Sequence, residues 1–328
     1  MRQQQFDILK GIGMILVLIG HVDCPRLVFN DIYLFHMPLF FFASGCFFKP
    51  KEQSFKEYIV KRAQRLLVPY LFFLFVFFIF NLFEAFVWHD ENGMHTAIKL
   101  KIIQFGIGII GMEESLSFRT IWFLICLFEV SVIYWILAQI KDLRLRSALS
   151  VVLFIAGYLF QRSDIDIPYF IDTALTVQLF YHLGYLFITK NISNIKFSPW
   201  VSVATIIIIY IFFNQRPVFT DYRTNMFLLV SVPLTILIVW NLYNLCNHLV
   251  SSKWATSVVV SLLNRIGVES LVILGLHRNF YIVLKPLLSH LPIGEYIMST
   301  ILVVAALTGT LLLSRPLERF IPKLIGKA

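Results

Sequence analysis

The chain has 328 residues, of which 58% are hydrophobic, 16% aromatic and only 14% charged, and its mean hydropathy is +0.78. A soluble domain carries about 25% charged residues, so this composition excludes soluble, disordered, fibrous and nucleic-acid-binding proteins and indicates an integral membrane protein. The formal net charge of +9 says little about a partner, because membrane proteins collect Lys and Arg on their cytoplasmic loops.

The first apolar run, residues 11–22, is expected to be a retained transmembrane helix and not an export signal. Lys10 stands at its entry, His21 at its exit, and no small-residue cleavage pattern follows. The cysteines form no CxxC pair and have no histidine at ligand spacing. We therefore expect packed thiols, with no disulfide and no metal site, at Cys24, Cys46, Cys126 and Cys246.

Hydropathy predicts an all-α protein with about ten membrane spans, since a helix needs about 20 apolar residues to cross the hydrocarbon core. The predicted spans are 6–22, 32–48, 66–88, 119–139, 147–161, 172–189, 199–213, 226–246, 267–284 and 295–313. The segment 98–112 is apolar but interrupted by glycines, so we expect a re-entrant or interfacial piece there. With no internal repeat and no long hydrophilic stretch, residues 1–328 are predicted to form a single transmembrane domain without a fused extracytoplasmic domain.

The distribution of basic residues predicts the orientation. With the amino terminus inside, 18 of the 28 Lys and Arg residues fall on the inner side and 9 on the outer side, with Lys10 inside the first span. Cytoplasmic loops carry such an excess. The sequence therefore predicts a multi-pass protein of the cell (inner) membrane with both termini in the cytoplasm.

Ionisable residues at membrane depth are costly and point to function. Lys10 and His21 lie eleven residues apart, which places them on one helix face about 16 Å apart along the axis. Asp7 shares that side and is placed to pair with Lys10. The alternative is structural: Lys10 extends toward the inner surface and His21 caps an interface.

The second span contains Phe35-His36-Met37-Pro38, followed by an aromatic run and Ser44-Gly45. Pro38 frees a backbone carbonyl that must find another partner, so His36 suits a position that lines a cavity. Ser44-Gly45 is interpreted as close helix packing more than as a nucleophile, since no Gly-x-Ser-x-Gly motif surrounds it, and the sequence leaves a covalent intermediate on Ser44 or on a histidine open.

Arg62 and Arg65 lie three residues apart, at positions i and i+3, on the expected helix that leads into the third span. Two guanidinium groups on one helix face suit an anionic group such as a phosphate, although positive-inside topology also explains a basic loop. Further polar residues at membrane depth are more often hydrogen-bonded helix contacts. These are Glu129, His182, Glu269, His277, Arg278 and Asn279.

Taken in order, these motifs resemble those of the acyltransferase 3 family of membrane-bound acyltransferases. Within that family, the motif sequences are most similar to those of the fucose 4-O-acetylase-like branch. The resemblance is dense over the first seventy residues and spans the chain. It rests on Asp7-x-x-Lys10-Gly11, His21, Phe35-His36-Met37-Pro38, Ser44-Gly45, Arg62-x-x-Arg65, Pro69-Tyr70, Trp122-Phe123-Leu124, Gly184-Tyr185, the stretch from Ser270 to His277, and Arg315-Pro316 with Phe320.

The resemblance implies a ten-helix enzyme that moves an acyl group from cytoplasmic acyl-CoA, usually acetyl-CoA, to a hydroxyl of an extracytoplasmic glycan. The family's Arg-x10-His pair maps onto Lys10 and His21, so the positive charge is kept but the bidentate guanidinium is lost. The Arg-x-x-Arg motif maps onto Arg62 and Arg65, which are expected to contact the CoA phosphates together with Lys10.

Residues and resemblance together predict an O-acetyltransferase for polysaccharide modification, with catalytic residues His21, His36, Lys10 and His277. A neutral His21, held by Asp23 or His36, is the expected general base, and His277 or Asn279 stabilises the oxyanion. The expected partners are acyl-CoA, a glycan or lipid-linked sugar acceptor and the lipid bilayer. No nucleic acid and no metal are expected, and the sequence allows a homo-oligomer.

A different class of function stays open. An intramembrane Lys10 and His21 would also suit a secondary transporter of a glycan or organic anion that relays protons. Such transporters commonly contain two matching halves with broken helices, and this sequence shows no such correspondence.

Overall fold

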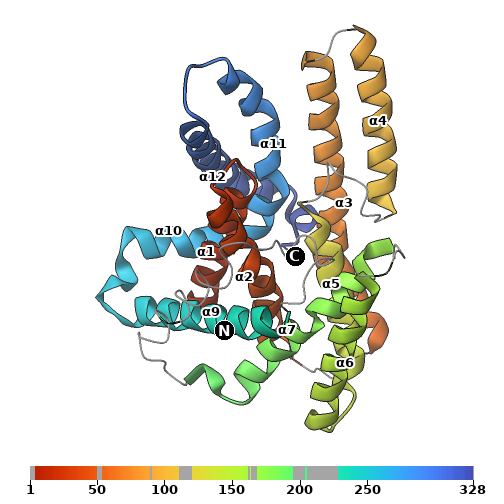
Figure 1. Cartoon of the computed structure of the whole chain (residues 1–328), viewed down its shortest axis with the longest axis vertical. Coiled ribbons are helices and arrows are strands. Elements are labelled where there is room, and N and C mark those ends of the chain that lie inside the picture. The colour runs from red at the N-terminus through yellow and green to blue at the C-terminus, as the bar shows by residue number, and fades with distance from the viewer. Residues whose placement is uncertain are drawn as a thin grey trace. The chain divides into compact units, whose positions relative to one another are not determined.

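The computed structural model describes residues 4–49, 54–88, 91–110, 120–161, 163, 168–194, 204 and 228–327. The regular structure in these ranges is helical throughout, which confirms the all-α prediction (Figure 1). The α-helices are α1 (Gln4–Gly20), α2 (Arg26–Cys46), α3 (Phe55–Trp88), α4 (Glu91–Ile109), α5 (Trp122–Ala138), α6 (Leu143–Gln161), α7 (Ile171–Thr189), α9 (Leu228–Ser251), α10 (Val258–Val268), α11 (Ser270–Ser289) and α12 (Glu295–Phe320). Short 3-10 helices are η2 (Pro168–Phe170), η3 (Ile192–Asn194), η4 (Lys253–Thr256) and η5 (Pro322–Ile325).

The predicted spans coincide with helices, except that almost all of 199–213 lies outside the described residues. In the described part, α3, α6, α11 and α12 are long and apolar enough to cross a membrane, while α5, α10 and residues 32–46 of α2 are apolar but shorter. The helices are thus confirmed. The number of crossings and the cytoplasmic position of both termini stay predictions.

Two details of the layout add to the sequence prediction. The segment 98–112 was expected to be a re-entrant or interfacial piece; α4 runs unbroken through it as far as Ile109, and its position in the membrane stays a prediction. A glycine inside a helix costs only about 1 kcal/mol relative to alanine, and packing of α4 on α3 offsets such a cost. The span 267–284 is divided, because α10 ends at Val268 and α11 begins at Ser270.

The chain divides into two compact units, each assembled from separate stretches of sequence. The first unit comprises Met1–Pro50, Tyr134–Ile165 and Leu175–Ser270, and the second comprises Lys51–Ile133, Asp166–Ala174 and Leu271–Ala328. The first unit therefore contains α1, α2, α6, α9, α10 and most of α7. The second contains α3, α4, most of α5, α11 and α12.

In the first unit α1 packs against α2, α9 and α10. The crossing of α1 and α10 depends on glycine, since a Cβ added to Gly11 would overlap the carbonyl oxygen of Leu263 and one added to Gly267 would overlap that of Asp7. Small residues of this kind let helix backbones approach closely in a membrane. The crossing fixes the position of α1, the helix that leads to His21.

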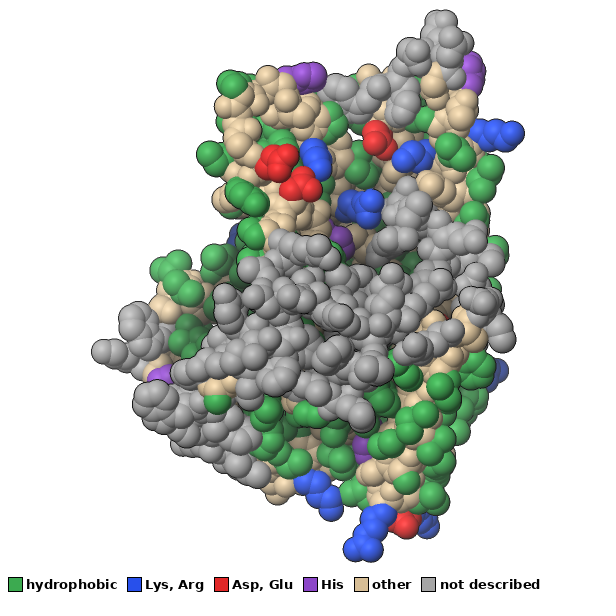
Figure 2. Space-filling model, viewed as in Figure 1, with side chains coloured by type: hydrophobic (Ala, Val, Ile, Leu, Met, Phe, Trp, Pro, Cys, Tyr) green, Lys and Arg blue, Asp and Glu red, His purple; other side chains and the backbone are tan. Residues whose placement is uncertain are grey.

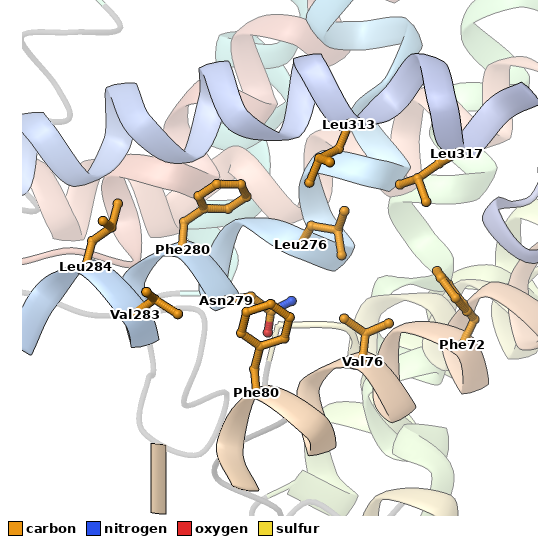
Figure 3. Close-up of a pocket in the computed structure, with 10 residues that line it drawn as sticks. All are labelled: Phe72, Val76, Phe80, Leu276, Asn279, Phe280, Val283, Leu284, Leu313 and Leu317. Carbon is orange, nitrogen blue, oxygen red and sulfur yellow. The ribbon is translucent and has the colours of Figure 1, made fainter. Parts of the chain in front are cut away.

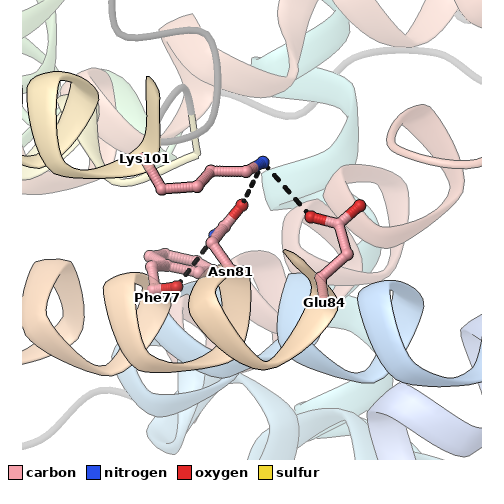
Figure 4. A network of polar contacts seen from close by, with 4 residues as sticks. All are labelled: Phe77, Asn81, Glu84 and Lys101. Atoms are coloured by element: carbon pink, nitrogen blue, oxygen red, sulfur yellow. Dashed lines mark hydrogen bonds and ion pairs between the residues drawn. The ribbon is translucent and has the colours of Figure 1, made fainter. Parts of the chain in front are cut away.

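In the second unit α3 and α4 lie side by side (Figure 1). Lys101 of α4 links them, because its Nζ donates to Asn81 Oδ1 at 3.0 Å and lies 3.2 Å from Glu84 Oε2 (Figure 4). The Asn81 amide nitrogen in turn donates to the Phe77 carbonyl at 2.8 Å. This network satisfies the polar groups of three side chains, so it is a packing contact between α3 and α4.

Large hydrophobic side chains cover much of the visible helix surface (Figure 2). Phe75 and Phe86 of α3 are 52% and 59% exposed, and Leu159 of α6 is 60% exposed. Exposure of this extent would be unfavourable in water and is expected for helices that face lipid.

Candidate functional site

His21 directly follows the last residue of α1 and is half-buried. Its Nδ1 lies 2.7 Å from the carbonyl oxygen of Val17, one helical turn earlier. A carbonyl only accepts hydrogen bonds, so Nδ1 carries the hydrogen of the neutral ring. Nε2 is then the nitrogen that accepts a proton, as a general base requires.

His36 of α2 has the same arrangement and is only 1% exposed. Its Nδ1 lies 2.8 Å from the Ile32 carbonyl, and the Tyr33 ring meets it edge-on with centroids 4.6 Å apart. The Tyr33 hydroxyl also donates to the Gly20 carbonyl at 3.1 Å, which ties α2 to the end of α1. Through Tyr33, the structure therefore places His36 near the end of α1, next to His21.

Pro38 lies inside α2 and cannot donate a hydrogen bond to the Leu34 carbonyl. That carbonyl instead accepts from the Thr235 hydroxyl of α9 at 3.1 Å, and Thr235 is fully buried. The expectation that the freed carbonyl needs a partner is thus confirmed. The partner itself, about two hundred residues away in the chain, was not foreseen.

Gly45, near the end of α2, packs closely against α7. A Cβ on Gly45 would overlap the Tyr181 carbonyl, and a Cβ on Gly184 would overlap the Phe42 carbonyl. The interpretation of Ser44-Gly45 as a packing motif is confirmed for Gly45. This second glycine crossing holds the helix that carries His36.

Lys10 pairs with Asp7 as expected, with Nζ and Oδ1 2.8 Å apart. The Asp7 side chain is only 5% exposed, while that of Lys10 is 27% exposed. The carboxylate balances part of the positive charge of Lys10, so an anionic ligand at Lys10 would compete with Asp7.

Arg62 and Arg65 belong to the second unit, on α3. The Nε of Arg62 donates to the Tyr58 hydroxyl at 3.2 Å, and its guanidinium carbon lies 5.4 Å from the centre of the Tyr58 ring. The Tyr58 hydroxyl donates to the Ser131 carbonyl of α5 at 3.1 Å, so Arg62 is oriented through a fixed tyrosine. Arg65 is exposed and makes no ion pair with any described residue.

The end of the chain reaches the same part of α3. Pro69 has no N–H, so the Arg65 carbonyl lacks its usual helical donor. The helix η5 packs at this point of α3, and a Cβ added to Gly326 would lie 2.9 Å from the Arg65 carbonyl oxygen. Gly326 adopts φ 74°, a conformation that glycine tolerates. The short helix η5, which also carries the exposed Lys323, thereby packs on the part of α3 that carries Arg65. Sequence reasoning missed this contact, although the Pro322-to-Gly326 turn was visible.

His277 and Asn279 of α11 are fully buried and 3% exposed, respectively. Nδ1 of His277 lies 2.9 Å from the Ile273 carbonyl, so neutral His277 has no hydrogen on Nε2 to offer an oxyanion. Asn279 has two N–H donors in any state. Neither its amide nitrogen nor its amide oxygen has a hydrogen-bond partner among the described residues.

His182 of α7 is hydrogen-bonded to side chains of two other helices, α5 and α6. Nδ1 lies 2.9 Å from the Tyr134 hydroxyl and Nε2 lies 2.9 Å from Ser147 Oγ. Nearby, Arg146 donates to the Ala138 carbonyl at 3.0 Å. The sequence interpretation of His182 as a hydrogen-bonded helix contact is confirmed.

The described residues contain no group of three or more His, Cys, Asp and Glu side chains placed to hold a metal ion. In the same part of the chain all four cysteines are free, and Cys46, Cys126 and Cys246 are buried.

Comparison with known proteins adds three findings. The family model described as an acyltransferase domain, acyltransferase 3, matches residues 3–317. Nodulation protein NolL of Mesorhizobium japonicum is 39% identical over 84 residues, which are 22% of this chain and only 22% of that protein's length. No solved structure matches.

Proposed function

This chain belongs to the acyltransferase 3 family, and we propose that it transfers the acyl group of an acyl-CoA to a hydroxyl of a cell-surface or exported glycan. Acetyl-CoA is the donor expected from the resemblance to the fucose 4-O-acetylase-like branch. Family membership supports a membrane acyltransferase.

In this proposal His21 is the general base, and its hydrogen bond to Val17 is the observation that carries the role. The acceptor hydroxyl oxygen bonds to the thioester carbonyl carbon while its proton passes to Nε2 of His21. The carbon–sulfur bond then breaks, and the proton moves from His21 to the departing CoA sulfur. General-base catalysis of this kind contributes about 10²- to 10⁴-fold to the rate.

His36 is proposed to be a positioning residue for His21. Its ring packs edge-on against Tyr33, and the Tyr33 hydroxyl donates to the carbonyl of Gly20, the residue directly before His21.

The donor phosphates are proposed to bind Arg62 and Arg65, with Lys323 as a further cation. Arg62 is already oriented by Tyr58, so little side-chain entropy is lost when an anion binds. Lys10 is expected to contribute less to phosphate binding, because it is already paired with Asp7. For the developing oxyanion we favour Asn279 over His277, because only Asn279 has N–H groups available in the neutral state.

The test is release of free CoA by the purified protein in nanodiscs, with acetyl-CoA and a panel of acceptor sugars. We expect His21→Ala to lower kcat by at least about 100-fold. The exposed histidine of α9 gives a matched control, His248→Ala, which should retain wild-type turnover.

Donor binding is tested separately in the same assay. Arg62→Ala should raise the KM for acetyl-CoA with a smaller effect on kcat, because ground-state binding is lost. Lys61→Ala, at an exposed neighbouring position on α3, should leave this KM unchanged. A wild-type protein that neither binds nor consumes any acyl-CoA would refute the proposal and leave proton-coupled transport as the hypothesis to test.

A further inference from the structure

An apolar pocket of about 450 Å³ lies within the second unit, between α3, α11 and α12 (Figure 3). Phe72, Val76 and Phe80 of α3 line one side, and Leu276 and Val283 of α11 line another. All three helices are long and apolar enough to cross a membrane. The volume lies within the range of about 300–1,000 Å³ that is typical of small-molecule sites.

Asn279 is the polar member of the described lining. Figure 3 shows its side chain extending from α11 toward α3 beside Phe80. Asn279 is only 3% exposed, and neither its amide nitrogen nor its amide oxygen has a hydrogen-bond partner in the described part of the chain. A buried amide without partners is costly, and at membrane depth water does not offset that cost. The pocket wall thus offers two N–H donors and one acceptor to a ligand.

The chemistry of the wall defines the ligand. Apolar side chains accommodate a hydrocarbon chain, and a single amide suits a single carbonyl group. An acyl group is a hydrocarbon chain that ends in one carbonyl. The methyl of an acetyl group is about the size of one water molecule, roughly 30 Å³, so acetyl alone would leave most of this pocket empty.

We propose, on the basis of the proposed function, that this pocket receives the hydrocarbon chain of the donor's acyl group and that the donor range extends to acyl groups of several carbons. The Asn279 amide nitrogen donates to the thioester carbonyl oxygen. As the acceptor oxygen bonds to the carbonyl carbon, that oxygen gains negative charge and the hydrogen bond strengthens. When the carbon–sulfur bond breaks, CoA leaves as the thiol and the acyl chain leaves the pocket as part of the new ester.

An acyl chain fits better than a chain of a membrane lipid. Lipid tails are as apolar as leucine side chains, so a lipid gains little when its tail moves from the bilayer into the pocket. The acyl chain of an acyl-CoA comes from water, and each methylene that it buries improves binding about fourfold. The pocket is therefore a selective site for a donor that arrives from water.

The experiment measures CoA release by the full-length protein in nanodiscs with acetyl-, butyryl-, hexanoyl- and octanoyl-CoA. We expect the wild-type KM to fall about fourfold per added methylene until the pocket is full. Val76→Phe fills the pocket and should lower the ratio of hexanoyl to acetyl kcat/KM at least about tenfold. Ile79→Phe, on the same helix but 46% exposed, should leave that ratio unchanged.

Asn279→Leu tests the hydrogen bond to the carbonyl. This variant should lower kcat for all four donors while the ratio between long and short chains is kept. Because partial unfolding would also lower the apparent kcat for every donor, kcat is expressed per folded molecule, with the folded fraction measured by thermal unfolding. A change in the ratio without a loss of kcat would contradict the assignment of Asn279 to the carbonyl.

The outcomes separate the pocket from the proposed function. Turnover of acetyl-CoA alone by the wild type, or an unchanged chain-length ratio in Val76→Phe, would overturn the pocket assignment and leave the acyltransferase intact. Another outcome is that native mass spectrometry detects a co-purified lipid in the wild type that is absent from Val76→Phe. If the dependence of kcat/KM on chain length is then the same in both proteins, the pocket is assigned to that lipid. No turnover with any donor would overturn both.

Discussion

Three histidines owe their orientation to the helix that carries them. In each, Nδ1 bonds to the carbonyl four residues earlier, which fixes the same tautomer at His21, His36 and His277. The ring can therefore accept a proton at Nε2 without changing its tautomer. His182 is oriented differently, because its Nδ1 bonds to the Tyr134 hydroxyl of α5 and its Nε2 to Ser147 Oγ of α6.

At the same scale, the Thr235 hydroxyl should contribute to stability through the Leu34 carbonyl. Thr235→Val keeps the shape of the side chain but leaves this buried carbonyl without a donor, so we expect a loss of about 1 kcal/mol. Thermal unfolding in detergent measures the effect. Thr300→Val is the matched control, since Thr300 is exposed and bonds to a carbonyl of its own helix. Equal melting temperatures for the two variants would contradict this assignment.

At the scale of helices, two glycine crossings position the parts of the first unit that carry chemistry. Gly11 and Gly267 let α1 approach α10, and Gly45 and Gly184 let α2 approach α7. At each of these glycines an added Cβ would meet backbone atoms, which cannot move aside as a flexible side chain can. The positions of His21 and His36 therefore depend on residues that have no functional group.

Gly267→Ala should separate α1 from α10, because the added methyl would overlap the Asp7 carbonyl. We expect a loss of about 1–3 kcal/mol in stability, with a fall in turnover as α1 shifts. Gly106→Ala is the control: Gly106 lies in α4 and has open space where its Cβ would be, so alanine should be neutral or slightly stabilising. The melting temperatures of both variants, measured in one detergent, test the contrast. Unchanged stability in Gly267→Ala would show that the crossing tolerates a wider separation.

At the scale of the whole molecule, the basic residues predict the orientation in the membrane, and Cys24 allows a direct test. Cys24 lies between α1 and α2, on the predicted outer side, and is the partly exposed one of the four cysteines. Burial, and then the nearby Asp23 carboxylate, raise the pKa of its thiol. Because the thiolate is the reactive form, labelling at pH 7 should be slow and should increase about tenfold per pH unit below that pKa.

A membrane-impermeant maleimide should therefore label right-side-out vesicles at pH 8.5, and Cys24→Ser should abolish the signal. Lys323→Cys in the Cys24→Ser background should be labelled only in inside-out vesicles. Labelling of Cys24 from the inside would reverse the predicted orientation. It would also remove the basis for placing the donor phosphates at the cytoplasmic ends of the helices.

Several features of the protein were determined by the sequence alone. Composition identified a membrane protein, and hydropathy located helices, because both depend on which residues are present and on their local order. The pairing of Asp7 with Lys10 followed from their spacing of three residues on one helix. The presence of Pro38 showed that a carbonyl would need a new partner. Each of these is a property of a single segment.

The tertiary structure alone decided which segments meet. Thr235 as the partner of the Leu34 carbonyl, η5 beside Arg65, and the pocket around Asn279 each join residues that are far apart in the sequence. The tautomers of the histidines also depended on the tertiary structure, since the hydrogen-bond partners of the ring decide which nitrogen carries the hydrogen of the neutral form. The physical reason is that hydropathy and helical spacing act along the chain, whereas hydrogen bonding and close packing between helices depend on their crossing in three dimensions.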